Sequence, residues 1–538
     1  MDKRVLLAVV LSLLVLYFFD AYFAPPKKQQ PLKKQGERVE TLIPGKKSGE
    51  ILEEKKLDSY PSVPHSVSLP EREITVETPL YSAVFSSHGA TLKRWSLKKY
   101  FDQLGEKGKP IEMVTGKERG EYPLGLSLVW GKGTEALDIP FEPDQESLNL
   151  TSDQDKGAII FWGKTSEGVL VKKTFVFSPK NYLIEINVEI VPPASVALPK
   201  GAIITWVRKL DPKKEAYNSS LGFIGPAAYV DGKVNEIKLK SLNEGDKSFP
   251  QGVRWVGFED KYFLAAFLPN NQGLVSAGVV RTDNESVLIN CFEKLKSSPQ
   301  GGKEVFSFGF YCGPKDIDIL RSLGRDLEKV IDFGMFDVIA KPLLYILKYL
   351  NKLTHNYGWA IILLTIILKV IFFPLTHKSY KSMKALKDLQ PQMTALKKKY
   401  GNDKEQLNRE LLNLYRTYKV NPLGGCLPML IQFPIFIAFY WVLLGSIELR
   451  HTPFMLWIKD LSAYDPYYIT PVLMGASMFI TQKMTPTTGD PTQAKMMLAM
   501  PIVFTFLFLK FPSGLVIYWL VNNILQIFQQ LYIDKRVS

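Results

Sequence analysis

The stretch Trp359-Ala360-Ile361-Ile362-Leu363-Leu364-Thr365-Ile366-Ile367-Leu368-Lys369-Val370-Ile371-Phe372-Phe373 is almost continuously apolar, with one lysine near its end. With its flanks, this run is long enough to cross a bilayer as a helix. A charged side chain inside such a helix is costly, so Lys369 is a candidate functional residue. The alternative is that Lys369, a few residues before Pro374, snorkels its ammonium group to the nearby membrane surface.

The sequence contains further apolar segments of this kind. The last part of the chain holds five of them, at 357–375, 424–445, 467–482, 495–511 and 514–532. A sixth apolar run, Val5 to Phe19, lies near the N-terminus within residues 1–24. Aromatic residues such as Tyr22 and Phe23 stand where signal-peptide cleavage would require small ones. We therefore expect six transmembrane helices, the first being an uncleaved anchor.

The distribution of basic residues predicts the topology. The chain has 538 residues and a formal net charge of +14, and many of its Lys and Arg residues lie between 377 and 421. Basic loops of membrane proteins lie on the cytoplasmic side. Lys3 and Arg4, like Lys535 and Arg536, place both termini in the cytoplasm. This accounts for the basic charge without nucleic-acid binding, and it predicts that residues between the anchor and 357 are exported.

The exported region is predicted to be a flexible linker and a β domain. Residues 25–70 are rich in Pro, Lys, Gln, Glu and Ser and lack a sustained apolar period. In 182–190, large apolar residues occupy every second position, which indicates a strand with one buried face. Shorter strands are expected at 74–77, 81–85, 171–177, 273–280 and 305–310. The pattern of residues 71–335 thus predicts a large antiparallel β-sandwich. We identify no catalytic cluster in this part of the sequence.

Two features of this domain carry little functional weight. His88 stands beside Gly89 in a predicted turn and is interpreted as a loop residue. Cys291 and Cys312 could form a disulfide outside the cytoplasm or remain thiols, because geometry and not spacing decides pairing.

Two segments show helical amphipathic patterns. Residues 336–356 predict an interfacial amphipathic helix, the alternative being an ordinary core helix. Residues 377–421 predict a cytoplasmic hairpin of two helices broken at 401–403. The charge of the hairpin signals topology and attracts lipid head groups, or it forms a landing platform for a ribosome or a nascent chain.

The combined pattern is that of a polytopic α-helical membrane protein with a large exported antiparallel β-sandwich domain. The predicted core comprises residues 357–538. Its spans contain polar side chains that either line one wet surface or join helices through hydrogen bonds: Thr365, Lys369, Gln432, Asn522, Asn523 and Gln526.

Several motifs resemble the YidC membrane-protein insertase family, in its long form with an exported β domain. The resemblance is close over about 336–538 and is carried by these motifs in order: Phe373-Pro374-Leu375-Thr376, Asn421-Pro422-Leu423-Gly424-Gly425-Cys426-Leu427-Pro428, Asp465-Pro466-Tyr467-Tyr468-Ile469, Gln482-Lys483-Met484 and Phe511-Pro512-Ser513-Gly514-Leu515.

The resemblance implies insertion and folding of inner-membrane proteins, alone or with the Sec translocon, through a hydrophilic, positively charged groove in a five-helix core. Lys369 matches the groove's positive residue, which is arginine in many relatives. Arginine's planar fork is therefore missing here. The substrate-binding groove that the resemblance implies comprises Lys369, Thr365, Gln432, Phe433, Phe436, Leu507, Tyr518 and Trp519.

The same resemblance implies the partners and the location. The partners are nascent membrane proteins, Sec translocon subunits, membrane lipids, and a ribosome bound through the hairpin and the C-terminus. The location is the bacterial inner membrane, with the β domain in the periplasm. No catalytic residue, metal or cofactor is expected, and the sequence has no GxxxxGK[ST] nucleotide motif.

Other functions compete with this one. Polar groups in interrupted spans also mark solute or ion transporters, here with an exported sugar-binding-like domain. A β-sandwich can bind or process carbohydrate, although a fold does not imply a function. A scaffold for other membrane complexes is the third alternative.

Overall fold

The structure is a computed structural model. The N-terminal anchor (1–24), nearly all of the linker (25–70) and the motif stretch 421–426 lie outside the residues that it describes. The described residues are 70–115, 122–131, 133–210, 223–270, 275–282, 286–294, 303–401, 403–418, 427–484 and 491–537.

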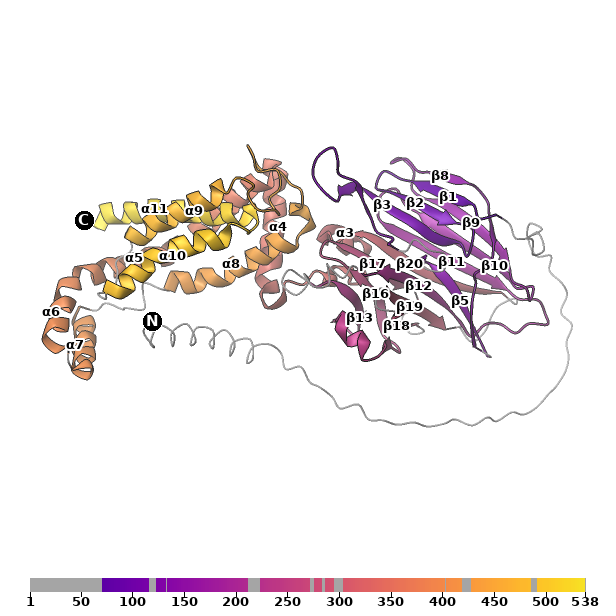
Figure 1. The fold of residues 1–538 in the computed structure, drawn as a ribbon, viewed down its shortest axis with the longest axis horizontal. Helices are drawn as coiled ribbons and strands as arrows, with labels where there is room; N and C mark the ends of the chain where they lie inside the picture. The colour runs from indigo at the N-terminus through magenta and orange to yellow at the C-terminus, as the bar shows by residue number, and fades with distance from the viewer. Residues whose placement is uncertain are drawn as a thin grey trace. The chain divides into compact units, whose positions relative to one another are not determined.

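The described β strands form three sheets (Figure 1). The five-stranded sheet has the order β4 (Pro110–Glu112), β3 (Thr91–Phe101), β2 (Tyr81–Ser86), β1 (Glu73–Glu77), β8 (Ser147–Asn149). The nine-stranded sheet has the order β14 (Lys233–Glu236), β13 (Gly225–Val230), β16 (Val253–Glu259), β17 (Phe263–Pro269), β20 (Glu304–Pro314), β11 (Leu183–Val191), β10 (Leu170–Phe177), β9 (Gly157–Lys164), β7 (Phe141–Pro143). The six-stranded sheet has the order β15 (Lys247–Phe249), β18 (Val275–Arg281), β19 (Ser286–Lys294), β12 (Gly201–Lys209), β5 (Gly125–Trp130), β6 (Gly133–Ala136).

The alternation in the sequence is reproduced in the strands. On β11, Ile184, Ile186, Val188 and Ile190 are fully buried and the residues between them are more exposed. The pairings are antiparallel with one exception among the described strands, the parallel pair β1–β8. The expectation of a wholly antiparallel domain is therefore wrong at this edge. Strands β2 to β7 lie between β1 and β8 in the chain, and such a long connection permits the parallel pairing that a hairpin turn does not.

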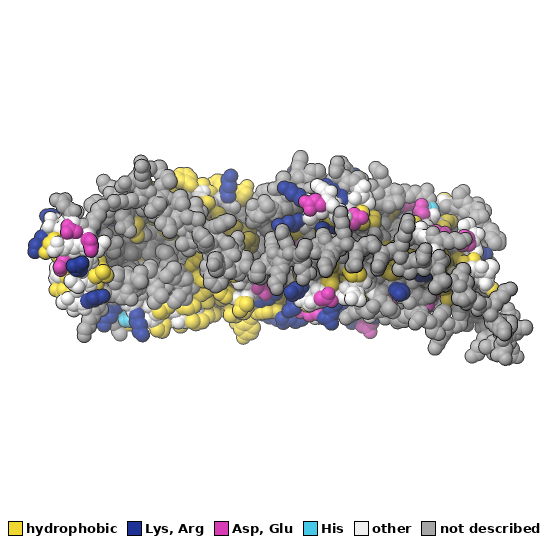
Figure 2. Space-filling model, turned by 90° about the horizontal axis from the view of Figure 1, so that it is seen from below, with side chains coloured by type: hydrophobic (Ala, Val, Ile, Leu, Met, Phe, Trp, Pro, Cys, Tyr) yellow, Lys and Arg dark blue, Asp and Glu magenta, His cyan; other side chains and the backbone are white. Residues whose placement is uncertain are grey.

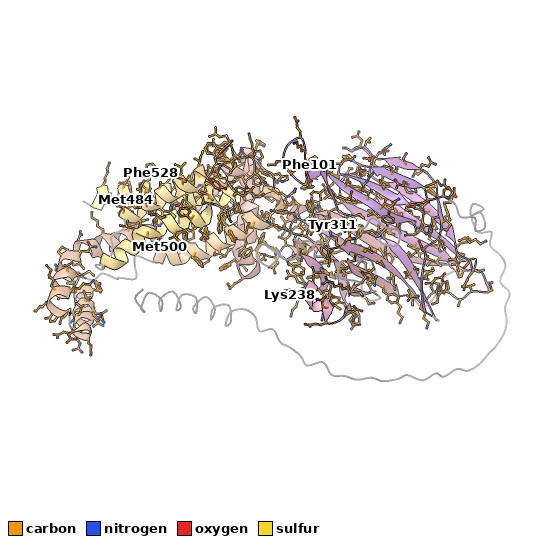
Figure 3. All side chains as sticks on the ribbon, viewed as in Figure 1. Phe101, Lys238, Tyr311, Met484, Met500 and Phe528 are labelled. Atoms are coloured by element: carbon orange, nitrogen blue, oxygen red, sulfur yellow. The ribbon has the colours of Figure 1, made fainter. Side chains whose placement is uncertain are left out.

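Aromatic side chains join the sheets into one core. Phe85 of β2 packs against Phe161, Phe175 and Phe177 of the nine-stranded sheet. Trp206 of β12 packs against Phe310 of β20, so the six-stranded sheet meets the nine-stranded one. Tyr311, labelled among the strands in Figure 3, is fully buried. Large rings dominate this core because each removes a large apolar area from water.

The structure settles the state of the two cysteines. Cys291 and Cys312 are both buried and unpaired. Burial raises the pKa of the Cys291 thiol, which disfavours the reactive thiolate. His88 Nε2 lies 2.5 Å from Asp138 Oδ1 at the turn between β2 and β3.

The described chain from residue 317 onward is largely helical, with a loop at 450–468 (Figure 1). Four short 3-10 turns, η1 (Leu239–Asn243), η4 (Leu327–Val330), η5 (Gly334–Phe336) and η7 (Ile447–Leu449), accompany the helices in the described residues. The helices are α3 (Ile317–Leu323), α4 (Asp337–Thr354), α5 (Tyr357–Asp388), α6 (Gln390–Tyr400), α7 (Lys404–Thr417), α8 (Leu427–Gly445), α9 (Ile469–Met484), α10 (Pro491–Phe508) and α11 (Ser513–Val537).

Helix α5 is longer than the sequence predicted. It continues through Pro374, where the predicted span ended, and takes in the start of the predicted hairpin at 377. Beside the proline, the Thr376 hydroxyl bonds to the carbonyl oxygens of Phe372 and Phe373. Pro374 removes the hydrogen bond to the Val370 carbonyl alone. Beyond it the helix is joined to α11, because Gln529 donates to Thr376 and Gln526 is hydrogen-bonded to Tyr380. The two helices beyond α5 are α6 and α7, separated at 401–403 as predicted.

One described helix segment, Tyr357–Leu386, is both long and apolar enough to cross a membrane. Gln432–Gly445 and Met497–Phe508 are shorter apolar segments. Figure 2 shows apolar side chains over the helical part and both basic and acidic side chains at the end where α6 and α7 lie. Six transmembrane helices therefore remain a prediction.

The loop before α9 is ordered by a buried carboxylate. Asp465 accepts hydrogen bonds from the backbone of Tyr467 and Thr470, from the Thr470 hydroxyl and from the Trp457 indole, at 2.7–3.0 Å. Four donors satisfy a fully buried carboxylate, so the Asp465-Pro466-Tyr467-Tyr468 motif has a structural explanation.

Candidate functional site

A cavity lies between α5, α8 and α11. Its volume is about 30 Å³, and a single water needs roughly 10–15 Å³, so it has room for on the order of two waters. The lining residues come from all three helices: Thr365, Leu368, Lys369, Phe372, Leu375, Thr376, Gln432, Ile435, Tyr518 and Asn522.

Helical spacing places these side chains together. On α5, Thr365, Lys369, Phe372 and Thr376 recur at intervals of three or four residues and share one face. Tyr518 and Asn522 are four residues apart on α11, and Gln432 and Ile435 are three apart on α8. The cavity is therefore formed by one stripe from each helix.

Most polar groups of the lining are already bonded within the protein. The Thr365 hydroxyl donates to the Ile361 carbonyl at 2.7 Å. Thr376 bonds to its own helix and accepts a hydrogen bond from Gln529 Nε2. The Tyr518 hydroxyl is hydrogen-bonded to the Gln432 amide. Because these groups are bonded within the protein, they have limited capacity to bind a ligand, and the rest of the lining is largely apolar.

Lys369 and Asn522 differ from the other polar residues of the lining. Within the described ranges, neither has a hydrogen bond or an ion pair with another residue, and no carboxylate neutralises the half-buried Lys369. An uncompensated charge among apolar helices is expensive unless water or a ligand solvates it. The cavity can therefore receive an anionic or strongly polar group.

The predicted groove residues fall into two sets. Lys369, Thr365, Gln432 and Tyr518 line the cavity, whereas Phe433, Phe436, Leu507 and Trp519 are not among its lining residues. Thr376 was missed, whereas Asn522 was named among the polar residues of the spans but not among the groove residues. Thr376 lies seven residues from Lys369, and Asn522 four from Tyr518, so helical periodicity could have found them.

The four apolar residues predicted to contact the substrate are of two kinds, exposed and packed. Phe433 and Leu507 are about half exposed, on the outer faces of α8 and α10. Phe436 and Trp519 instead pack edge to face, with ring centroids 4.5 Å apart. Other apolar side chains of α10 and α11 are exposed too, such as Met500 and Phe528, labelled in Figure 3.

The amide residues of α11 perform two different tasks. Asn523 Nδ2 donates to the Ser477 hydroxyl of α9 at 3.0 Å, and Gln529 bonds to Thr376 of α5. Gln526 is hydrogen-bonded to Tyr380 of α5. These three join helices, as the interhelical alternative predicted, whereas Asn522 lines the cavity.

Comparison with known proteins divides the chain into the same helical part and β domain that the structure shows. Residues 349–538 match the family described as "60Kd inner membrane protein", and residues 73–346 match "YidC periplasmic domain". The protein named "Membrane protein insertase YidC" from Syntrophus aciditrophicus (strain SB) is 43% identical over 547 residues, which covers 100% of both chains. The protein of the same name from Geotalea daltonii is 44% identical, again with 100% of both chains covered. A crystal structure titled as an active YidC insertase with its first transmembrane domain resolved is 22% identical, covers 85% of this chain and 91% of its own, and has a TM-score of 0.38.

Proposed function

The chain belongs to the YidC family of membrane protein insertases, and we propose that it inserts proteins into the bacterial inner membrane through the cavity at Lys369. The observation that carries this proposal is an ammonium group that has no partner among the described residues and lies in a largely apolar cavity between three helices. We define this cavity, with its ten lining residues, as the groove.

The groove lowers the main energetic cost of insertion, which is the dehydration of polar groups that cross the membrane. A polar or acidic tail that must cross the membrane loses its hydration in hydrocarbon, at a cost of several kcal/mol per unsatisfied group. A wet, positive groove shortens the apolar path and attracts acidic side chains. The reaction breaks no covalent bond, and burial of the apolar part of the substrate supplies free energy at about 25 cal/mol per Å².

The apolar part of a substrate requires a different surface. Phe433 on α8 and Leu507 on α10 are exposed and present apolar contacts to a passing helix. Phe436, one turn beyond Phe433 on α8, packs against Trp519 and so joins α8 to α11. A substrate would thus bind with its polar tail in the groove and its apolar segment against lipid.

The topology that suits this function has six transmembrane helices, with both termini in the cytoplasm and the β domain in the periplasm. Its support is the basic charge of 377–421 and of the C-terminus. Helix α4 has exposed apolar side chains besides its buried face, namely Val338, Ile346, Tyr349 and Leu353, which suits the membrane interface. The basic hairpin suits contact with a ribosome and lipid head groups, and the exported domain offers a surface for Sec translocon subunits.

Site-specific crosslinking to a stalled nascent membrane protein tests the groove path. Photoreactive residues at Thr365 and Phe433 should crosslink strongly to the nascent chain, and residues at Phe436 and Trp519, which pack against each other, should crosslink more weakly. A probe at Ile371, exposed on the same helix α5 as Thr365 but outside the groove lining, is the matched control and should crosslink mainly to lipid. Equal nascent-chain crosslinking from Ile371, or none from the four positions, would contradict the proposed path.

A further inference from the structure

Two contacts fix how α5 and α11 are aligned. Near the start of both helices, Ile361 Cδ1 lies 3.3 Å from where a Cβ of residue 514 would stand. Near the other end, Gln529 Nε2 donates to Thr376 Oγ1, across a sequence separation of 153 residues. Ile361 and Gly514 have the same separation, so the two helices run parallel with one register along this length.

That register places Lys369 opposite Asn522. The two residues are again separated by 153 positions and lie seven residues before Thr376 and Gln529 respectively. Seven residues are nearly two full helical turns, so each shares a face with the bonded residue of its own helix. Both line the groove, where Thr365 and Tyr518 form a further pair of the same separation.

Their hydrogen-bonding capacity is complementary. An ammonium group is a compact positive charge with donors only, and an asparagine amide offers two donors and one acceptor. Neither group has a partner among the described residues, while the neighbouring Tyr518, Thr376 and Gln529 do. A carboxylate between Lys369 and Asn522 could therefore accept one hydrogen bond from each helix.

We propose that Lys369 and Asn522 form one two-point receptor for a carboxylate of the translocating substrate, with Asn522 as a specificity-determining residue. The proposal rests on the proposed insertase function. Two donors from two helices reproduce what one guanidinium fork would supply from a single side chain. The substrate class is an acidic translocated segment, and the discrimination is against its neutral amide counterpart.

The test is a substitution cycle in the full-length protein reconstituted into liposomes. Insertion rates are measured for a substrate with an acidic tail and for the same tail with Asp replaced by Asn. Asn522→Leu should slow the acidic substrate about tenfold, the loss expected for one hydrogen bond to a charged group, and leave the neutral substrate within about twofold. In the Lys369→Arg background, the same Asn522 change should cost less than about twofold, because the fork supplies both donors.

Asn523→Leu is the matched control, since Asn523 neighbours Asn522 but is bonded to Ser477. It should lower the melting temperature without distinguishing the two tails, whereas Asn522→Leu should leave that temperature unchanged. An equal effect of Asn522→Leu on both substrates, or an equal effect with Lys and with Arg at 369, would overturn the two-point receptor. Failure of the proposed insertase function is distinguishable, because the unsubstituted protein would then insert neither substrate, and unchanged insertion by Lys369→Glu would instead exclude the route past Lys369.

Discussion

Two lysines illustrate how burial alone differs from a functional site. Lys173 is fully buried in β10, and its Nζ donates to the carbonyl oxygens of Gly89, Ala90 and Leu124 at 2.8–3.1 Å. Its three donors are thus all used, and its role is structural. Lys369 is half-buried and has no partner within the described residues. The unused hydrogen-bond donors of Lys369 therefore identify a functional site better than the extent to which a lysine is buried.

Reversing the charge at Lys369 should impair substrates selectively. Lys369→Glu is expected to slow insertion of a substrate with an acidic tail by about tenfold or more, because an attraction of about 1 kcal/mol is replaced by a repulsion of similar size even in water. The Lys369→Arg protein should insert the same substrate at nearly the normal rate. Protease protection of the translocated tail measures the insertion rate of both variants.

The control is Lys381→Glu, which makes the same charge change at an exposed position of α5. It should have little effect on the insertion rate of a substrate with either an acidic or a neutral tail. Normal insertion of acidic tails by the Lys369→Glu protein would show that charge attraction is not the role of this lysine.

Glu259 should make the β domain sensitive to pH. Burial raises the pKa of this β16 carboxyl to about 7, although Lys315, whose Nζ lies 3.1 Å away, opposes the shift. The folded domain therefore binds this proton more tightly than the unfolded chain, in which a Glu has a pKa of about 4.3. The stabilisation is fully present below about pH 4 and is lost as the pH rises to about 7, by up to roughly 3 kcal/mol.

Hydrogen exchange of the β16 and β17 amides between about pH 4 and 7.5, corrected for intrinsic exchange, measures this loss. Glu259→Gln should remove the pH dependence, whereas Glu185→Gln, at a more exposed position of β11, should keep it. A flat profile in the unsubstituted protein would contradict the expected proton uptake.

At the level of elements, α11 is fastened to its neighbours by side-chain amides. Replacing Asn523 and Gln529 by Leu removes bonds to α9 and α5, each worth about 1 kcal/mol in membrane helices. The double variant should melt several degrees lower in detergent, measured by tryptophan fluorescence. A melting temperature unchanged from that of the parent would show that packing alone holds α11.

The hairpin elements α6 and α7 carry a separate prediction. Deleting about residues 383–415 should reduce insertion several-fold, because the basic surface would no longer receive a ribosome or a nascent chain. The protease-resistant fragments of the remaining helices should be unchanged. Full activity of the deletion protein would reduce the hairpin to a topology signal.

At the level of the whole molecule, Lys348 of α4 ties together distant parts of the chain. Its Nζ lies 3.3, 2.8 and 2.9 Å from carboxylate oxygens of Asp316, Asp318 and Glu448. Lys348→Met would leave the nearly buried Glu448 without its counter-charge, and losing one partner of a buried pair costs about 3–5 kcal/mol.

We therefore expect Lys348→Met to speed tryptic cleavage around residues 325–341. The matched control is Lys341→Met on the same helix, because Lys341 forms only an i,i+4 pair with Asp337, worth a few tenths of a kcal/mol. Equal cleavage of the two variants would show that the Lys348 cluster is not a structural tie.

The sequence by itself determined the features that arise from local periodicity and charge. Alternation predicted β11, apolar runs predicted α5 and α8 to α11, and Gly401 to Asp403 marked the break between α6 and α7. The predicted end of this span at Pro374 is wrong, because a proline removes only one backbone hydrogen bond and α5 continues through it. All of these features depend on residues close together in the chain.

Only the tertiary structure decided which polar residues share the groove. Asn522 and Asn523 are adjacent and chemically identical, yet one lines the groove and the other bonds to α9. One residue along a helix is a rotation of about 100°, and the packing of α5 and α9 against α11 determines which face meets which neighbour. Lys369 and Asn522 are 153 residues apart, so their pairing depends on the register between two helices, which no local pattern encodes.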